Sequence, residues 1–260
     1  MRKESNAKQP SGDQPGCNDC RNASRAIPDF TFAFQPIVNI ATRGIFAFEA
    51  LVRGPGGESA EWVFTQVDAD NLHAFDQACR TRAVRLAATL GMQALLSINF
   101  LPNAVSSPRK CIRSTLRECE RTGFPASQII FEVSETENVI NPAHLLDIFR
   151  RYREMGFRTA IDDFGAGYAG LGLLGQYQPD LLKLDMGLVC GIDAHAPRQI
   201  IVEGLVAMAK RLGTTVIAEG IETARERDCL RAMGIELMQG FLFCEPIFQG
   251  LGTIRADAWE

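Results

Sequence analysis

The sequence has no apolar run near the ~18 residues that a membrane-spanning helix needs. Its N-terminal stretch, from Met1 to Arg25, is polar and lacks the apolar segment of a secretory signal. Both absences argue against a membrane protein and against export through such a signal. We therefore expect a cytoplasmic protein without a membrane partner.

The chain also lacks a strongly basic stretch. It carries 27 lysines and arginines against 31 acidic residues, a formal net charge of -4. Proteins that bind duplex nucleic acid gather basic residues on one face, so we expect no duplex nucleic acid as a partner. A nucleotide ligand is still compatible with this charge, because a bound metal ion can reverse the local sign.

Histidine is scarce, with three residues, while the eight cysteines are scattered along the chain. Several of these thiols fall in predicted helices or strands, which is typical of reduced, buried cysteines. Cys17 and Cys20 form a single Cys-x-x-Cys, which suits half of a zinc site or a redox pair. No second pair or suitable histidine lies nearby. We interpret them as two exposed thiols in a flexible N-terminal arm, residues 1–28, that is rich in Ser, Asn, Gln, Gly and Pro.

Apolar segments of alternating type fill the rest of the chain, residues 29–260, which we assign to one domain. The composition, 46% hydrophobic, is sufficient for a large core. Runs rich in β-branched and aromatic residues predict strands, and longer amphipathic runs that end at glycine predict helices. The predicted strands cover residues 30–39, 45–53, 94–100, 128–134, 157–163, 181–186, 214–219 and 237–243. The main predicted helices cover residues 70–90, 110–121, 142–155, 198–212 and 223–233.

Eight strands with helices between most of them predict an α/β fold, a TIM-like (β/α)8 barrel. The first two strands are separated only by a short turn that contains Gly44. Such spacing favours a hairpin, so we expect this first strand pair to be antiparallel. The alternative is an open doubly wound sheet, which we disfavour because no glycine-rich phosphate fingerprint follows the first strand.

Two adjacent carboxylates, Asp162 and Asp163, end the fifth predicted strand, and a loop with two glycines follows. Neighbouring carboxylates that lose solvation repel each other and usually need a cation. The alternative is that Asp163 caps the turn while Asp162 faces solvent.

Polar residues lie near the ends of six other strands as well. The carboxyl ends of barrel strands carry the catalytic groups in TIM-type enzymes, so we expect these side chains to converge. Oxygen ligands without histidine or cysteine indicate a hard cation rather than zinc. The residues are Glu49, Arg53, Asn99, Glu132, Glu135, Lys183, Asp185, Glu219, Glu222 and Gln239.

Lys183 is the one lysine at these strand ends. Beside cations and in a low dielectric we expect its pKa to be lowered, so that it acts as a base or stabilises negative charge. Asp185 lies two residues further on the same strand face and is expected to orient it. The alternative is a structural ion pair with Glu219 or Asp185.

These motifs resemble those of the EAL-domain family, the bacterial phosphodiesterases of cyclic di-GMP. The resemblance extends over residues 30–248 and includes seven motifs in order. They are Gln35-Pro36-Ile37, Glu49-Ala50-Leu51 with Arg53, Ser97-Ile98-Asn99, Glu132-Val133-Ser134-Glu135, Asp162-Asp163-Phe164-Gly165, Lys183-Leu184-Asp185, and Ala218 to Thr223 followed by Gln239-Gly240-Phe241.

The resemblance implies hydrolysis of cyclic di-GMP to linear pGpG with two Mg²⁺ or Mn²⁺ ions, and a homodimer. Metal ligands would be Glu49, Asn99, Glu132 and Asp162, with Asp162 bridging to a second ion beside Asp163. Glu219 would act through water and Lys183 would assist the attacking water. Substrate-binding residues would be Gln35, Arg53 and Gln239, while Glu135 would hold the loop after the fifth strand.

That loop departs from the family pattern at three positions. Many members have Thr where this chain has Ala166, and two serines where it has Ala169 and Gly170. The alternative function is a non-catalytic cyclic di-GMP receptor or a protein-interaction module on the same barrel. A glycosidase also uses paired carboxylates, but it explains neither Lys183 nor the adjacent Asp162 and Asp163.

Overall fold

The computed structural model describes residues 26–167 and 170–260. Cys17, Cys20 and most of the predicted arm lie outside these residues, as do Tyr168 and Ala169 of the loop after the fifth strand. No helix among the described residues is both long enough and apolar enough to cross a membrane.

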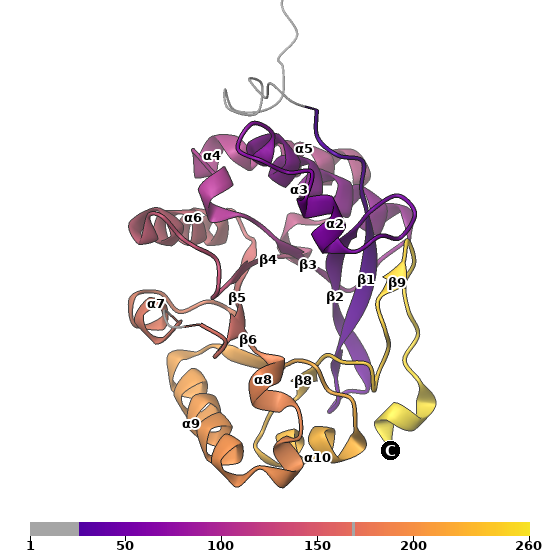
Figure 1. Ribbon diagram of the computed structural model, residues 1–260, viewed down its shortest axis with the longest axis vertical. Coiled ribbons are helices and arrows are strands. Elements are labelled where there is room, and N and C mark those ends of the chain that lie inside the picture. The colour runs from indigo at the N-terminus through magenta and orange to yellow at the C-terminus, as the bar shows by residue number, and fades with distance from the viewer. Residues whose placement is uncertain (1–25, 168–169) are drawn as a thin grey trace, which may run out of the picture.

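Nine strands form one sheet that closes on itself (Figure 1). Neighbours from β2 through β8 run parallel, whereas β1 is antiparallel to β2, β8 and β9. The predicted barrel with an antiparallel first pair is therefore confirmed. The strands are β1 (Thr31–Asn39), β2 (Gly44–Arg53), β3 (Leu95–Asn99), β4 (Ile129–Ser134), β5 (Arg158–Phe164), β6 (Leu181–Leu184), β7 (Thr215–Ala218), β8 (Leu237–Met238) and β9 (Ile247–Phe248).

Pro36 lies inside β1, where a missing N–H would normally interrupt a sheet. One edge of β1 pairs with β2 along its whole length. The other edge pairs with β9 at Ala33 and Phe34 and with β8 at Val38 and Asn39, which leaves Pro36 between the two short pairings. The proline therefore occupies an unpaired part of that edge.

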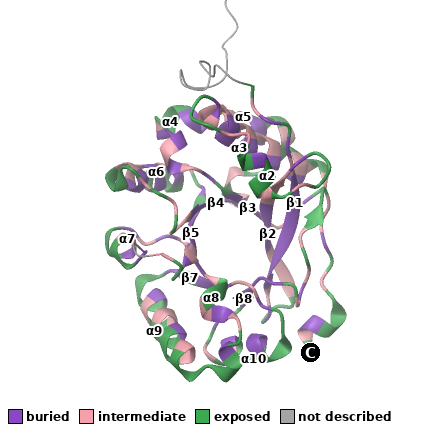
Figure 2. Cartoon of the chain, viewed as in Figure 1, coloured by how far each residue is buried: buried purple, intermediate pink, exposed green. Residues whose placement is uncertain are grey.

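Helices surround the barrel, with their buried faces toward the strands and their exposed faces outward (Figure 2). One apolar core lies between the strands and α3, α5 and α6, and a second lies beneath α9 and α10. The helices are α2 (Ala60–Phe64), α3 (Leu72–Thr89), α4 (Pro108–Cys111), α5 (Arg113–Thr122), α6 (Pro142–Glu154), α7 (Gly170–Gln176), α8 (Met186–Val189), α9 (Ala196–Leu212) and α10 (Ala224–Ala232). Short 3-10 turns cover Pro102–Ala104, Ala126–Gln128, Ile192–Ala194 and Ala256–Trp259.

The last predicted strand, residues 237–243, is wrong beyond Met238. The chain instead turns against the loop after β7, where Ile221 N–H donates to Gln239 O at 3.1 Å and accepts Leu242 N–H on its carbonyl at 3.0 Å. A Cβ on Gly240 would lie 2.1 Å from that carbonyl oxygen, so only glycine permits this approach. The turn carries Gln239 to the carboxyl end of the barrel.

The barrel interior has an apolar layer toward the amino ends of its parallel strands. Seven buried side chains from seven strands form it: Ile37, Ala47, Ile130, Ala160, Leu181, Ile217 and Leu237. Side chains two residues apart share one face of a strand. The next inward-facing layer is therefore fixed by the residue two positions away on each strand.

Candidate active site

Polar side chains occupy that next layer. Each apolar interior residue has a polar partner two positions toward the carboxyl end of the parallel strands, and these partners are Gln35, Glu49, Glu132, Asp162, Lys183, Glu219 and Gln239. All of them are buried except Glu219, which is half-buried. The strand period thus gathers seven predicted site residues in one ring at the mouth of the barrel.

Asp163 breaks this alternation, because consecutive residues of a regular strand face opposite sides. The β5–β6 pairing is irregular between Ile161 and Phe164, and Asp163 has φ of 55°. Its N–H donates to Asp162 Oδ1 at 2.9 Å. Its own Oδ2 accepts a hydrogen bond from Ser134 Oγ at 2.8 Å. This bulge brings both neighbouring carboxylates to the mouth, at the cost of about 1 to 3 kcal/mol of backbone strain.

Lys183 lies at the centre of the acidic residues and is 1% exposed. Its Nζ is 2.7 Å from Glu219 Oε1 and 3.0 Å from Asp162 Oδ1. It is 3.2 Å from one oxygen each of Glu49 and Glu132. Four strands therefore supply carboxylates to one ammonium group on β6.

The charge of this lysine differs from the sequence-based expectation. Burial alone would lower the pKa of Lys183, but Asp162, Glu132, Glu219 and Glu49 together outweigh it and hold that pKa well above its ordinary value. The expected lowering is thus wrong for the metal-free site, because the carboxylates act on the lysine without any cation between them. Asp185 is also not its partner, since Oδ1 of Asp185 accepts Gly187 N–H at 2.8 Å and caps α8.

Burial alone lowers the pKa of a lysine but raises the pKa of a carboxyl group. Burial raises the pKa of Glu132 to about 8, with Lys183 opposing the rise and Glu49 and Asp162 adding to it. Burial likewise raises the pKa of Glu219 well above its usual range, again against the effect of Lys183. Each of these two carboxyls therefore ionises less readily than an exposed one, although Lys183 lies beside it.

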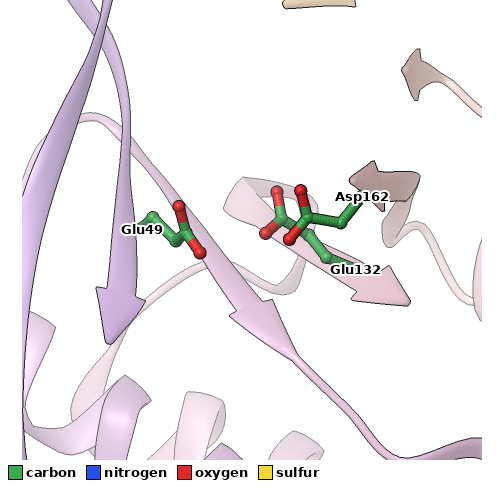
Figure 3. A group of neighbouring side chains, drawn as sticks. All are labelled: Glu49, Glu132 and Asp162. Atoms are coloured by element: carbon green, nitrogen blue, oxygen red, sulfur yellow. The ribbon is translucent and has the colours of Figure 1, made fainter. Parts of the chain in front are cut away.

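Two groups of carboxylates at the mouth have the spacing of metal ligands. Glu49, Glu132 and Asp162 have oxygen atoms within 4.8 Å of one another, and so do Asp162, Asp163 and Glu219. Figure 3 shows Glu132 and Asp162 side by side, with Glu49 facing them from β2. Asp162 belongs to both groups and is the only residue they share.

These residues fit a pair of hard cations. Oε1 of Glu132 is buried and has no hydrogen-bond partner among the described residues, a costly state that a metal ion would relieve. All the ligand atoms are oxygens, which Mg²⁺ and Mn²⁺ prefer. When all five carboxyls are ionised, they and the one ammonium leave four negative charges, which two divalent cations would balance.

Asn99, Gln35 and Gln239 surround Glu49. Asn99 Nδ2 donates to Glu49 Oε1 at 3.2 Å, and Gln239 Nε2 donates to Glu49 Oε2 at 2.8 Å. Gln239 also donates to Gln35 Oε1 at 3.0 Å. Arg53 lies apart from the carboxylates, and its guanidinium donates to Val52 O at 2.8 Å.

Glu135 holds the loop that follows β5. Its Oε2 accepts the N–H groups of Gly165 at 2.7 Å and Gly167 at 3.3 Å, and its Oε1 accepts that of Gly170 at 2.6 Å. Three backbone donors on one carboxylate fix the positions of these three glycines relative to the end of β4. A Cβ on Gly170 would lie 2.7 Å from Glu135 Oε1 and 2.5 Å from the Phe164 ring, so glycine is needed for the contact.

Two adjoining cavities open at the mouth, and both are lined by Leu51. The acidic one has a volume of about 390 Å³ and is lined by Lys183, Gln35 and four of the five carboxylates, all but Glu132. The other, about 260 Å³, is more apolar and is lined by Phe64, Asn99 and Arg53 among others. The acidic cavity is also lined by Met186, at the start of the short α8, and by Phe241, and neither apolar side chain gives a signal of a site in the sequence.

Comparison with known proteins agrees with this geometry. The sequence matches the EAL domain over residues 18–246. The chain belongs to the EAL-domain family. Membership of this family accounts for the barrel and its antiparallel first pair.

Among solved structures, this EAL domain is similar to a standalone EAL protein of Vibrio cholerae in its c-di-GMP-bound form. The two are 46% identical with a TM-score of 0.88, over 91% of this chain and 100% of that one. It is also similar to Klebsiella pneumoniae BlrP1 in a manganese and cyclic di-GMP complex, with 37% identity and a TM-score of 0.82 over 86% of this chain and 58% of that one.

Among curated proteins, the EAL domain is 32% identical to the cyclic di-GMP phosphodiesterase RocR of Pseudomonas aeruginosa, over 84% of this chain and 58% of RocR. It is 31% identical to the blue light- and temperature-regulated antirepressor BluF of Escherichia coli, over 88% of this chain and 56% of BluF. The chain thus spans little more than half the length of these two relatives.

Proposed function

We propose that this chain hydrolyses cyclic di-GMP to linear pGpG with two Mg²⁺ or Mn²⁺ ions. The observation that carries the proposal is the pair of carboxylate groups that share Asp162 around Lys183. Relatives named as cyclic di-GMP phosphodiesterases, and structures of similar EAL proteins with cyclic di-GMP, support the choice of substrate.

The chain's own residues divide into two metal-binding groups and a set that orients them. Glu49, Asn99, Glu132 and Asp162 would hold one ion, and Asp162, Asp163 and Glu219 would hold the other, Glu219 through water. When bound, two such ions supply activation of a water nucleophile and shielding of the leaving oxygen. The remaining requirement on the protein is to keep five acidic side chains in place before the ions arrive.

Lys183 keeps four of these acidic side chains in place, and we also assign it a role in the reaction. Its ammonium donates hydrogen bonds to Glu49 and Glu132 and pairs with Asp162 and Glu219, so it holds these oxygens around one point. In the reaction we assign it to the attacking water, where a proton held at Nζ stabilises developing negative charge. Gln239 and Gln35 fix the orientation of Glu49 and extend toward the substrate.

The substrate would lie across both cavities. The cyclic dinucleotide has two identical halves, and the mouth has two adjoining hollows of about 390 Å³ and about 260 Å³. Arg53 lines the second hollow, where its guanidinium would meet a phosphate of the substrate. Glu135 keeps the loop after β5 in its hydrogen-bonded form beside the second metal group.

We further propose that the enzyme is cytoplasmic and works as a homodimer. Residues 29–260 would form its catalytic unit. Within the described part of the chain, Cys79, Cys119, Cys190, Cys229 and Cys244 form no disulfide, which agrees with a reducing compartment. Sedimentation analysis of the purified protein tests the dimer directly.

The deciding experiment is a chromatographic assay with cyclic di-GMP and Mg²⁺ or Mn²⁺, alongside an EDTA control. We expect metal-dependent formation of pGpG, and its loss in Glu49→Gln, which removes a ligand charge while preserving shape. Glu203→Gln changes an exposed residue on α9 and should behave as the unaltered protein. Turnover that survives in Glu49→Gln would contradict the metal assignment.

A second candidate function is a receptor or protein-interaction module that binds without cleavage. The similarity to an antirepressor favours it, since that relative is named for regulation rather than for hydrolysis. Binding of cyclic di-GMP without product, at saturating metal, would support this candidate over the enzyme.

A further inference from the structure

Three arginines line a small cavity away from the acidic mouth. Its volume is about 90 Å³, and its lining consists of Arg43, Arg227 and Arg231 with Ile40, Ala41, Ala258 and Trp259. The lining contains no acidic residue. Arg43 belongs to the β1–β2 turn at the amino end of β2, so the cavity lies toward the end of the barrel opposite the metal-binding groups.

Arg227 and Arg231 are four residues apart on α10 and therefore share one helix face. Arg227 is 4% exposed, and its guanidinium is fixed by Ala258 O at 2.8 Å and by Asp228 Oδ1 at 2.9 Å. These contacts use three of its five N–H groups, so two donors are left. The buried arginine is thus held rigidly at the edge of the cavity.

Arg43 is oriented by an unusual backbone conformation. Its φ is 55°, in the left-handed region that favours glycine. Asn39 Oδ1 accepts the N–H groups of Ala41 at 2.9 Å and Thr42 at 3.0 Å, which fixes the turn that precedes it. A non-glycine residue kept in a strained position is a recognised sign of a functional constraint.

The positive charge in this cavity is not neutralised. Neither Arg43 nor Arg231 has an acidic partner among residues 26–167 and 170–260. Asp228 is paired with Arg227, and nearby Asp257 is paired with Arg255 at 2.6 Å. Arg43 and Arg231 are exposed at the rim of the cavity and Arg227 is buried, so a phosphate group between them would meet three positive charges.

We propose that this cavity is an anion site that takes a phosphate group, as inorganic phosphate or as the phosphate of a small monoester. Arginine forks match the geometry of phosphate oxygens, and charge-assisted bonds of this type are among the strong ones in proteins. The volume, about that of three waters at roughly 30 Å³ each, suits one tetrahedral group. A larger ligand would place only its phosphate here.

The test is titration calorimetry on the full chain with inorganic phosphate and with GMP, at constant ionic strength. EDTA is present, so that no metal at the acidic mouth attracts phosphate. We expect at least one of the two ligands to bind. Arg231→Ala, and the double variant Arg43→Gly with Arg231→Ala, should weaken that binding about tenfold or more. Glycine suits the backbone of residue 43, so the double variant should fold.

Arg225→Ala is the matched control, because Arg225 is an exposed arginine of α10 that does not line the cavity. Its affinity should equal that of the unaltered protein. Binding of inorganic phosphate identifies the free ion as a ligand, whereas binding of GMP alone identifies a monoester. The proposal is overturned if neither ligand binds, or if the double variant binds as tightly as the control. None of these outcomes depends on hydrolysis of cyclic di-GMP.

Discussion

At the mouth of the barrel, one ammonium group among four carboxylates affects which side chains carry a proton. Lys183 holds its proton because the acids outweigh its burial, and Glu132 holds one because burial outweighs the lysine. Divalent cations would have to displace the proton on Glu132 to reach its oxygens. The protonation of single side chains is therefore coupled to metal binding.

We predict that metal binding releases a proton below the pKa of Glu132. The raised pKa of about 8 means that, from about pH 4.5 to about pH 8, the folded metal-free protein binds more protons than the unfolded chain. Its free energy of unfolding should therefore fall as pH rises through this range, while its affinity for Mn²⁺ should rise. Calorimetric titrations near pH 7, in two buffers of different ionisation enthalpy, should give different heats.

The control is the same pair of titrations at about pH 9, above the pKa of about 8, where Glu132 has already lost its proton. There Glu132 no longer contributes a proton, so the difference between the two heats should be smaller than near pH 7. Equal heats near pH 7 would contradict a proton on Glu132.

Ser134 supports the second metal-binding group through a hydrogen bond to Asp163. Its Oγ accepts Thr136 N–H at 3.1 Å, so its own proton is available for Asp163 Oδ2 at 2.8 Å. Ser134→Ala should weaken metal binding or turnover about 10- to 100-fold, as loss of such support does in metal sites. Ser134→Thr keeps the hydroxyl and should retain function. Measured metal affinities of the two variants that do not differ would exclude this role.

Much of the site could be predicted residue by residue, because carboxylates inside apolar strands are visible in the sequence. The period of two then places Glu49, Glu132 and Asp162 on one inner face. Ser134 gives no such signal, since a serine at a strand end is common. Of the two ion-pair partners that the sequence suggests for Lys183, Glu219 lies 2.7 Å from its Nζ, whereas Asp185 follows the strand end and turns to cap α8.

At the scale of elements, the long helices and the strand order were predictable from periodicity and from glycine at helix ends. The predicted helix over residues 110–121 is instead two helices, α4 and α5, with Ile112 between them. The short α2, α8 and β9 were not predicted, because two to five residues are too few to show a period. The end of β8 depends on contacts with Ile221, which a local pattern cannot contain.

Gly170, the first residue of α7, has no room for a side chain between Phe164 and Glu135. Gly170→Ser introduces the side chain that many relatives are expected to carry, yet here it meets the Phe164 ring and Glu135 Oε1. We expect loss of about 1 to 3 kcal/mol of stability and a fall in turnover, because overpacking separates Glu135 from the loop. Urea unfolding and the pGpG assay measure both effects.

Gly172→Ser is the control within the same helix, since nothing lies within 4 Å of a Cβ at that position. It should leave turnover and the unfolding midpoint nearly unchanged. If the two serine variants behaved alike, helix propensity rather than the contact with Glu135 would explain the result.

For the whole molecule, the cluster around Lys183 connects strands across the barrel. The lysine on β6 pairs with acids from β2, β4 and β5 and with Glu219 just after β7. In the metal-free protein, Lys183→Met leaves these acids without their cation and should cost about 3 to 5 kcal/mol of unfolding free energy. Lys210→Met, an exposed change on α9, should cost little.

The same pair of variants can be compared with and without Mn²⁺ in urea unfolding. Metal should restore more stability to Lys183→Met than it adds to the unaltered protein, because the ions then supply the missing positive charge. A metal-free Lys183→Met protein as stable as Lys210→Met would show that the cluster contributes nothing to the barrel.

The long separations within the mouth have a consequence for how the chain folds. Lys183 and Glu49 are 134 residues apart, and Gln239 and Gln35 are 204 residues apart. Contacts of such high sequence separation pay their loop-closure entropy late in folding. A nascent chain that has emerged only as far as β4 has two acids of the first metal group and none of the second. The ions therefore cannot template early folding, and their capture reports that the ring of strands has closed.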